Sequence, residues 1–181
     1  MSITTRRGDA GKTQLYSGQV ISKSDLPPKA VGALDEAVSA LGIARSLTAS
    51  TDLHDRILEL QRACFVVGSE LATHPDFTHR LKERVDEEFL RTLDAERDRL
   101  EAIVPMPDGF VIPGGTPVAA HLDHARTLFR RCESIAVEMW EKDFLRNPLV
   151  LKWLNRCSDL LWLFARQVEG DTVTPRRPPR T

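Results

Sequence analysis

Apolar residues recur at spacings of three and four along most of the chain, and this pattern constrains the fold more than any other feature. Such spacing places apolar side chains on one face of an α-helix. The clearest stripe consists of Val118, Leu122, Ala125, Phe129, Cys132, Ala136 and Met139. Comparable stripes run through residues 31–41, 53–71 and 150–164, and a looser one runs from about residue 77 to 103. The sequence therefore predicts five amphipathic helices.

Residues that favour helix starts stand at the head of four of these segments. Proline is well tolerated in the first helical turn, and Ser, Thr, Asp or Asn side chains cap the free backbone N–H groups. These start signals are Pro27-Pro28, the run Ser50, Thr51 and Asp52, Thr116-Pro117, and Asn147-Pro148.

Strand patterns are nearly absent, so the expected fold is all-α, a five-helix bundle with ferritin-like up-down packing. The helices occupy residues 27–169. Residues 1–26 are rich in Gly, Ser and Thr, and we expect a loop that is ordered by itself or by a ligand, with room for a short strand. Residues 170–181 carry repeated Pro and Arg, and we expect a disordered tail.

The bulk properties exclude several classes of protein. A chain of 181 residues fits one domain, and its formal net charge of −1 gives no global attraction to nucleic acid or to anionic membranes. No apolar run reaches the roughly 18 residues that a membrane span needs, and no signal peptide is evident. The three cysteines lie far apart inside helical patterns and are expected to be buried thiols. We expect a cytoplasmic protein.

Polar side chains border the apolar stripes of the last two helices. On the fourth expected helix they are Arg126, Arg130 and Glu133, and on the fifth they are Asn155, Asp159, Trp162 and Arg166. Spacings of three and four place each set on one helix face. An ordinary solvated face would carry similar charges. Charges beside a buried seam are costly unless they are paired or liganded, which favours a binding site.

The N-terminal stretch TRRGDAGKT resembles a phosphate-binding P-loop only superficially. The Walker A pattern needs a glycine five residues before the glycine of Gly-Lys-Thr, and that position holds Arg6. Gly8 and Gly11 nevertheless allow backbone N–H groups to turn toward an anion. Hydroxyl and cationic groups nearby are Thr5, Thr13, Arg6, Arg7, Lys12 and Lys23. The stretch is predicted to bind phosphate groups or to form a simple glycine turn.

Two further features have plain explanations. The stretch FVIPGGTP is a loop that ends in a helix cap, and Phe110 at its start could fill a core position. His121 and His124 are three residues apart and could share a metal ion. No third ligand of suitable type is evident, so no metal site of the protein's own is predicted.

Several stretches resemble the PduO-type ATP:cob(I)alamin adenosyltransferases. They are TRRGDAGKTQL, VISKSD, GALDEAVSALGIAR, LQRACFVVGSELAT, FVIPGGTPVAAHLDHARTLFRRCES and LKWLNRCSDLLWLFAR. In order and spacing they cover most of residues 3–167. The A-R-T-x-x-R-R-x-E and L-N-R-x-S-D-L-L blocks are the most specific.

The resemblance implies a homotrimeric five-helix bundle that binds ATP at subunit interfaces and transfers its 5′-deoxyadenosyl group to cob(I)alamin, releasing triphosphate. The N-terminal loop would wrap the triphosphate, and helices four and five would complete the ATP site with Mg²⁺. The residues implied for ATP are Thr5, Arg6, Arg7, Gly8, Thr13, Gln14, Lys23, Arg130, Arg131, Glu133, Ser134 and Asn155.

The resemblance also implies a cobalamin side of the site. Phe110 would keep the lower axial face of the corrin clear, and Trp162 would also lie on the cobalamin side. Arg126 would pair with Asp35 of a neighbouring subunit, and these two residues with Arg130 are the expected catalytic set. Possible protein partners are a reductase and an enzyme that uses adenosylcobalamin.

Some positions depart from the family pattern. Val31 and Val38 replace a usual tyrosine and asparagine, Lys12 replaces a small or hydroxyl residue, and Trp162 replaces a phenylalanine. The nucleotide positions are nearly complete, whereas the corrin-facing ones have changed. The alternative is therefore a non-catalytic carrier or regulator that binds cobalamin or a nucleotide on the same fold. A purely structural helical protein is the third possibility.

Overall fold

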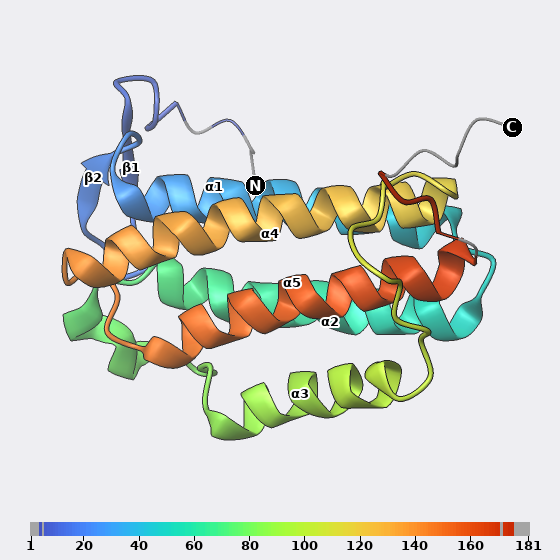
Figure 1. The fold of residues 1–181 in the computed structure, drawn as a ribbon. Helices are drawn as coiled ribbons and strands as arrows, with labels where there is room; N and C mark the ends of the chain where they lie inside the picture. Colours follow the sequence, from blue (N-terminus) through green and yellow to red (C-terminus); the bar gives the residue numbers. More distant parts are fainter. Residues whose placement is uncertain (1–3, 5, 171, 176–181) are drawn as a thin grey trace, which may run out of the picture.

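Four long helices form the body of the molecule in a computed structural model that describes residues 4, 6–170 and 172–175. They are α1 (Leu26–Leu47), α2 (Thr51–Leu71), α4 (Pro117–Glu141) and α5 (Pro148–Glu169). Helix α1 packs against α4 and α2, and α5 packs against α4 (Figure 1). Helix α3 (Glu87–Glu101) lies outside this group and contacts α5. Along the chain, successive helices run in opposite directions (Figure 1).

The helix starts lie at the predicted signals. The Thr116 hydroxyl accepts a hydrogen bond from the backbone N–H of Ala119 at 3.1 Å, and the Asn147 side chain accepts one from Leu149 at 3.1 Å. Ser50 caps α2 in the same way. These side chains satisfy backbone donors that the first turn of a helix leaves free. The predicted beginnings of α1, α2, α4 and α5 are therefore confirmed.

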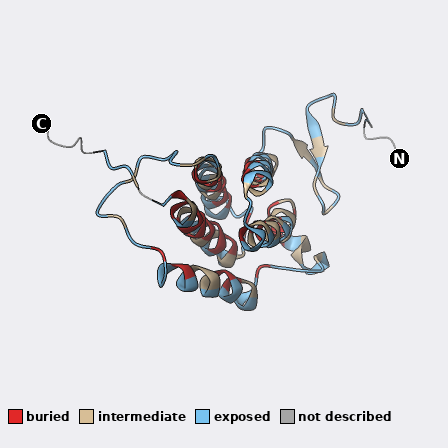
Figure 2. Cartoon of the chain, turned by 90° about the vertical axis from the view of Figure 1, so that its right-hand side faces the viewer, coloured by how far each residue is buried: buried red, intermediate tan, exposed pale blue. Residues whose placement is uncertain are grey.

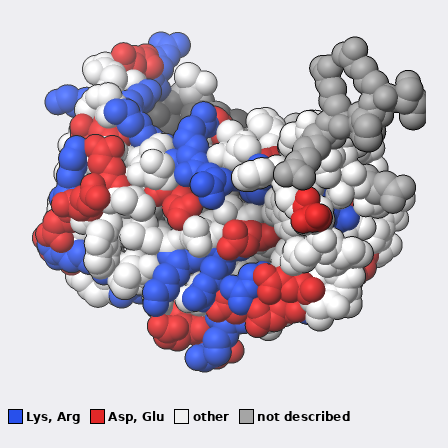
Figure 3. Space-filling view, in the orientation of Figure 1, with Lys and Arg blue, Asp and Glu red and all other residues white. Residues whose placement is uncertain are grey.

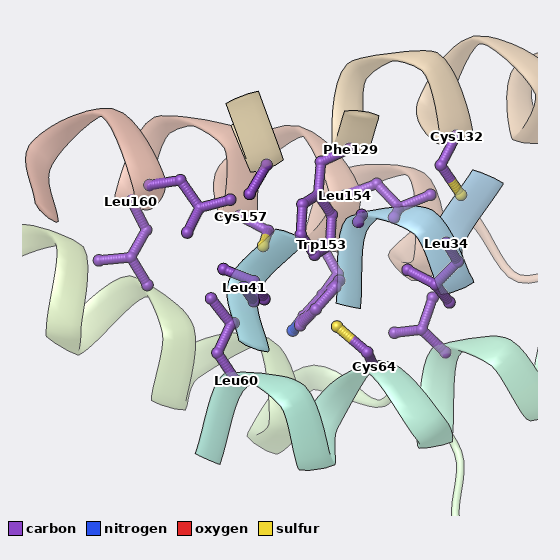
Figure 4. Close-up of a cluster of buried hydrophobic side chains, with 14 of the residues drawn as sticks. Leu34, Leu41, Leu60, Cys64, Phe129, Cys132, Trp153, Leu154, Cys157 and Leu160 are labelled. Carbon is purple, nitrogen blue, oxygen red and sulfur yellow. The ribbon is translucent and has the colours of Figure 1, made fainter. Parts of the chain in front are cut away.

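The core lies mainly between the facing sides of these four helices, and α3 adds buried leucines at its edge (Figure 2). Phe129 of α4 and Trp153 of α5 are fully buried, and their ring centroids are 6.2 Å apart. Figure 4 shows them between leucines contributed by the neighbouring helices. Helix α1 instead contributes mostly small side chains, which are Ala30, Ala33, Ala37, Ala40 and Ala44. Small residues let neighbouring helices approach closely, and α1 and α4 are in contact along their length.

The prediction of one continuous helix over residues 77–103 is wrong. A short 3₁₀ helix, η1 (Pro75–Arg80), is followed by non-helical chain, and α3 begins only at Glu87. Within this connection Val85 is buried, and its backbone N–H donates to the buried carboxylate of Glu70 at 2.7 Å. That side-chain acceptor replaces the helical carbonyl and holds the chain extended there.

The N-terminal segment contains the short strand that the sequence allowed, as one half of a hairpin. Strands β1 (Lys12–Gln14) and β2 (Val20–Ser22) pair antiparallel, with Thr13 opposite Ile21. The hairpin is attached to the end of α2 by a hydrogen bond from the backbone N–H of Tyr16 to the carbonyl of Ala72 at 3.0 Å. The fold is thus a helical bundle with one two-stranded sheet, which lies beside the start of α1 (Figure 1).

The long connection between α3 and α4 crosses the far end of the bundle and meets the chain that follows α5 (Figure 1). The backbone N–H of Ile112 donates to the carbonyl of Val173 at 2.8 Å. Residue 171 and residues 176–181 of the expected disordered tail lie outside the described part of the chain. Within the described part, no helix combines the length and apolarity required to cross a bilayer.

Candidate functional site

The polar residues predicted at the border of α4 and α5 do meet there. The side-chain amide of Asn155 on α5 donates to Glu133 on α4 at 3.1 Å. Arg131 of α4 forms an ion pair with Glu36 of α1. Arg130 is exposed on the same helix. The three helices therefore share a polar border in which Arg130 keeps its guanidinium in solvent.

Ser134 stands one residue beyond Glu133 and is also exposed. Ser134 is four positions after Arg130, so it lies on the same side of α4, one turn further along the helix. Figure 3 shows Lys and Arg side chains over the face on which α4 lies, with Asp and Glu side chains between them. Any anion bound on this face would be held by local cations, since the whole chain is nearly neutral.

The N-terminal loop forms two tight turns that bring Lys23 against a glycine. Backbone hydrogen bonds run from Asp9 to Arg6 and from Gly11 to Gly8. A Cβ atom built on Gly8 would lie 2.8 Å from Lys23 Nζ, so the ammonium group lies directly over that backbone. The backbone N–H of Lys23 also donates to the carbonyl of Gly11 at 2.9 Å.

This arrangement explains the residue types of the loop. Gly11 has a φ of 73°, a conformation that side chains disfavour, and Arg6 adopts a similar φ of 58°. Arg6, Arg7 and Lys12 are exposed and place cationic groups beside the hairpin, where Figure 3 shows Lys and Arg side chains interspersed with Asp and Glu. Thr5 lies outside the described residues. The loop therefore has the cationic composition of an anion site, although the backbone N–H groups of Asp9, Gly11 and Lys23 donate to loop carbonyls in this conformation.

Thr13 and Gln14, the other two residues predicted to bind ATP from this segment, both lie on β1. Thr13 is half-buried on β1, opposite Ile21 of β2. Gln14 is exposed, but its side-chain amide donates to the carbonyl of Gly18 at 2.8 Å and closes the hairpin turn. In this conformation the amide of Gln14 stabilises the turn and does not point its donor outward.

The residues predicted for the corrin side are found at two places. Phe110 is 87% exposed on the connection before α4, which excludes the simpler role of a core residue. Trp162 on α5 is half-buried, with the guanidinium carbon of Arg166 at 5.4 Å from its ring centroid. Arg126 pairs with Asp123 of its own helix, Nε to Oδ1 at 3.3 Å.

Asp35, the other member of the expected catalytic set, is exposed on α1. It precedes Glu36, which pairs with Arg131 across the α1–α4 seam. The carboxylate of Asp35 is therefore accessible to a second molecule, as the predicted intersubunit pair requires. The structure of one chain does not test that pair.

Sequence reasoning missed the buried charges beneath this site. Asp123, Arg166 and Glu169 are 3%, 4% and 9% exposed, respectively. Arg166 was recognised as a border residue, but its two carboxylate partners were not. Asp123 follows directly on a residue of the apolar stripe, and this position inside the seam was the available signal.

No resident metal centre is found in the part of the chain that the structure describes. No group of three His, Cys, Asp or Glu side chains is placed to hold an ion there. His121 is half-buried and His124 is exposed on α4. The three cysteines are buried free thiols, as predicted.

Fold and site together define a class of protein: a helical bundle with a cationic glycine loop at one end and a polar seam between its last two helices. The family model described as cobalamin adenosyltransferase matches residues 3–168. The chain belongs to the cobalamin adenosyltransferase family.

Individual relatives agree with this assignment. A corrinoid adenosyltransferase of Citrobacter freundii is 38% identical over 164 residues, which span 91% of this chain and 93% of the relative. The corrinoid adenosyltransferase PduO of Salmonella typhimurium is 36% identical over 172 residues. Those residues span 94% of this chain but 51% of that relative, so the chain matches about half of the longer protein.

Solved structures show the same fold. A phenylalanine-to-alanine variant of a PduO-type ATP:corrinoid adenosyltransferase from Lactobacillus reuteri, complexed with cobalamin and ATP, superimposes with a TM-score of 0.88. It is 30% identical, and the match covers 97% of this chain and 100% of that one. An arginine-to-lysine variant complexed with ATP gives a TM-score of 0.84 at 32% identity, covering 93% of this chain and 94% of that one.

Proposed function

We propose that this chain is an ATP:corrinoid adenosyltransferase. In the reaction, the electron pair of cob(I)alamin attacks C5′ of ATP, a cobalt–carbon bond forms, and the carbon–oxygen bond to the triphosphate breaks. The products are adenosylcobalamin and triphosphate. Family membership over nearly the whole chain carries this proposal, together with a cationic N-terminal loop and an exposed arginine at the polar border of α4 and α5.

The reaction needs positioning and charge stabilisation from the protein rather than a nucleophilic side chain. Cob(I)alamin is itself the nucleophile, so the protein has to hold C5′ close to cobalt and stabilise the leaving triphosphate. The N-terminal loop supplies backbone N–H groups and cations for that leaving group. Its members are Thr5, Arg6, Arg7, Gly8, Thr13, Gln14 and Lys23. Gln14 would have to release Gly18 in order to take part.

The α4–α5 border supplies the rest of the nucleotide site. Arg130 has an exposed guanidinium, whose planar fork matches phosphate oxygens. Asn155 and Glu133 are already hydrogen-bonded to each other and would contact the nucleotide as a unit. Arg131 and Ser134 complete the set.

The residues present fit a Mg²⁺ ion that arrives with ATP. Mg²⁺ usually binds one or two carboxylates together with substrate phosphates and water. Glu133 is the candidate carboxylate. Its Oε1 accepts the hydrogen bond from Asn155, which leaves Oε2 to face the ion. When bound, the ion would neutralise charge on the triphosphate, while Glu133 and Asn155 orient the nucleotide.

On the corrin side, Phe110 provides an exposed aromatic ring on the connection before α4. An apolar ring beneath the corrin would exclude a lower axial ligand. Four-coordinate cob(II)alamin is easier to reduce, so this exclusion would help a reductase to form the nucleophile. Trp162 would add a second aromatic surface, and Arg126 would pair with Asp35 of a neighbouring subunit.

We further propose that the working form is a homotrimer with sites between subunits and that each subunit is a five-helix, ferritin-like up-down bundle. Alternating helix directions support the second statement. Partly exposed apolar side chains on α1 and α4 support the first, because such surfaces commonly form interfaces. They are Ile43, Leu47, Val137 and Trp140. Buried free cysteines support a reducing, cytoplasmic location, where an adenosylcobalamin-dependent enzyme would receive the product.

A visible spectrum tests the proposed activity. Pure protein is mixed anaerobically with MgATP and chemically reduced cobalamin, and the light-sensitive spectrum of adenosylcobalamin is followed. We expect the product to form catalytically, with many turnovers per site. Retention of the corrinoid without alkylation would instead identify a carrier. The departures at Val38 and Trp162 motivate that alternative.

A further inference from the structure

Three buried charged side chains form a cluster that the reaction chemistry does not use. Asp123 comes from α4, and Arg166 and Glu169 come from the last turns of α5. We call these three residues the buried charge cluster. Burial of charge is costly unless each group is paired, and a well-packed apolar cluster would be as stable. Its presence therefore calls for a role other than bundle stability.

The contacts of the buried charge cluster are continuous. Arg166 Nη2 lies 2.6 Å from Asp123 Oδ2 and 2.8 Å from Glu169 Oε2. The other oxygen of Glu169 accepts a hydrogen bond from the backbone N–H of Gly115 at 2.8 Å. The cluster thus joins both of the last two helices to the connection that carries Phe110.

The contact with Glu169 leaves room only for glycine at position 115. A Cβ atom at that position would lie 2.5 Å from Cγ of Glu169, which is closer than atoms can approach. The connection is held a second time by the hydrogen bond between Ile112 and Val173, beyond the end of α5. Phe110 therefore projects from a segment whose position is set by the C-terminal end of α5.

At its other side the cluster reaches the remaining corrin-side residues. Asp123 Oδ1 lies 3.3 Å from Nε of Arg126, so Asp123 holds one arginine on each oxygen. The guanidinium of Arg166 stands over the ring of Trp162 at 5.4 Å. Arg126, Trp162 and the segment of Phe110 thus all contact one buried group of charges.

We propose that the buried charge cluster is a positioning device that fixes the corrin side of the site as one unit. This inference rests on the proposed function. Asp123, Arg166 and Glu169 are positioning residues, because they act through Arg126, Trp162 and Gly115. The nucleotide residues Arg130, Glu133 and Asn155 have other described partners or face solvent, so the cluster sets corrinoid binding and leaves ATP binding alone.

Replacing Glu169 tests the inference with little change of volume. In Glu169→Gln the charge that pairs with Arg166 is lost, while an acceptor for Gly115 remains. Loss of one partner of a buried ion pair is worth about tenfold or more in an equilibrium, so we expect the KM for cob(I)alamin to rise about tenfold. The KM for ATP should stay within about twofold by the same reasoning, because no nucleotide residue is touched.

The matched control is Glu88→Gln on α3, which removes an exposed carboxylate paired with Arg91. It should leave both KM values unchanged. Wild-type protein is assayed first, since absence of adenosylcobalamin there would reject the proposed function itself. With active wild type, an unchanged cobalamin KM in Glu169→Gln overturns the positioning inference. Parallel loss of ATP and cobalamin binding also overturns it, because that pattern indicates a general structural role.

A second variant reaches the same contact from the other side and serves if Glu169→Gln does not fold. Gly115→Ala places a Cβ against Glu169 and should also raise the cobalamin KM with little change for ATP. Its effect should shrink in a Glu169→Ala background, where the clashing side chain is absent, because coupled positions are non-additive. Fully additive effects of Gly115→Ala and Glu169→Ala would show that the two positions act separately and would overturn the inference.

Discussion

Arg130 illustrates how exposure separates function from stability at the level of one residue. Its side chain lies at the polar border of α4 and is exposed, so its removal leaves no cavity and no buried unpaired group. Its guanidinium is accessible to a ligand, as the proposed ATP site requires. The same argument applies to Asp35, which is exposed on the adjoining face of α1.

Arg130→Ala is therefore expected to impair catalysis without unfolding the protein. Loss of one charged donor to a developing negative charge typically costs about 100-fold in kcat. Steady-state rates with MgATP and cob(I)alamin measure the effect, and a thermal melt should show a midpoint close to wild type. Arg62→Ala, on the exposed face of α2, is the matched control. Near-normal turnover of Arg130→Ala would remove Arg130 from the ATP site.

The buried thiols predict a loss of stability at alkaline pH. Burial raises the pKa of Cys132 to about 12 and also raises the pKa values of Cys64 and Cys157 well above their usual range. The folded protein then keeps protons that the unfolded chain releases above a pKa near 9. The stabilisation is complete below pH 9 and is lost as the pH rises toward 12, by about 1.4 kcal/mol per thiol and pH unit.

Urea titrations at pH 8, 9, 10 and 11 measure this dependence. Cys132→Ala is the comparison, since tyrosine and lysine titrate equally in both proteins. The variant is less stable at pH 8 because it loses a buried side chain, but its free energy of unfolding should fall less steeply between pH 9 and 11. Parallel pH profiles for the two proteins would contradict the prediction.

Residues that act locally could be predicted from the sequence, whereas residues that act through tertiary contacts could not. The spacing of Arg130 and Glu133 revealed their shared helix face, and the glycines at 8 and 11 revealed the loop. Glu169 gave no such signal, because its partner Gly115 is 54 positions away and lies in an irregular connection. Family resemblance supplied the ligands, which periodicity alone could not.

Among the elements, α3 is attached differently from the other helices. It packs mainly on α5, where Leu90, Leu93 and Leu100 are buried at the edge of the core, and ion pairs add to its attachment (Figure 2). Asp94 pairs with Arg156 of α5, and Glu96 pairs with Arg56 of α2 across a groove between α2 and α3. An element held in this way is expected to open more readily than the packed helices.

Asp94→Ala should loosen α3 selectively. The partly buried pair with Arg156 is worth about 1 kcal/mol, which corresponds to roughly fivefold faster exchange of the α3 amides if α3 opens as a unit. Hydrogen–deuterium exchange read by mass spectrometry measures peptides from α3 and from α1 side by side. Asp98→Ala, which removes an exposed partner of Arg97 on the same helix, is the control. Equal acceleration in α1 would show that α3 opens only with the whole bundle.

Four helices were predictable because each has both a start signal and a strong stripe. The α3 region failed because apolar residues at 81, 85 and 89 imitate a helical period across non-helical chain. Asp86, followed by Glu87 and Glu88, is a good N-cap with an acidic first turn, and it marks the true start. Local pattern could not reveal that Glu70, from α2, binds the backbone at Val85 and interrupts the helix.

For the whole molecule, the proposed trimer predicts a definite mass. Light scattering after size exclusion should give about three times the chain mass of 20.3 kDa. Apolar side chains exposed on α1 and α4 should then be buried between subunits, so a polar substitution such as Trp140→Glu should shift the mass toward one chain. Glu141→Gln, at the adjacent exposed position, is the control. A mass of one chain for the wild-type protein at assay concentration would rule out a site shared between subunits.

The alanines of α1 have a consequence for how far the site walls can move. Most of the buried side chains of α1 are methyl groups, which have no rotamers to exchange, so this face of the helix can adjust little by side-chain movement. We therefore expect the distance between α1 and α4, which carry Glu36 and Arg131, to change little when a ligand binds. Rearrangement on ligand entry is then expected in the hairpin rather than along this side of the site.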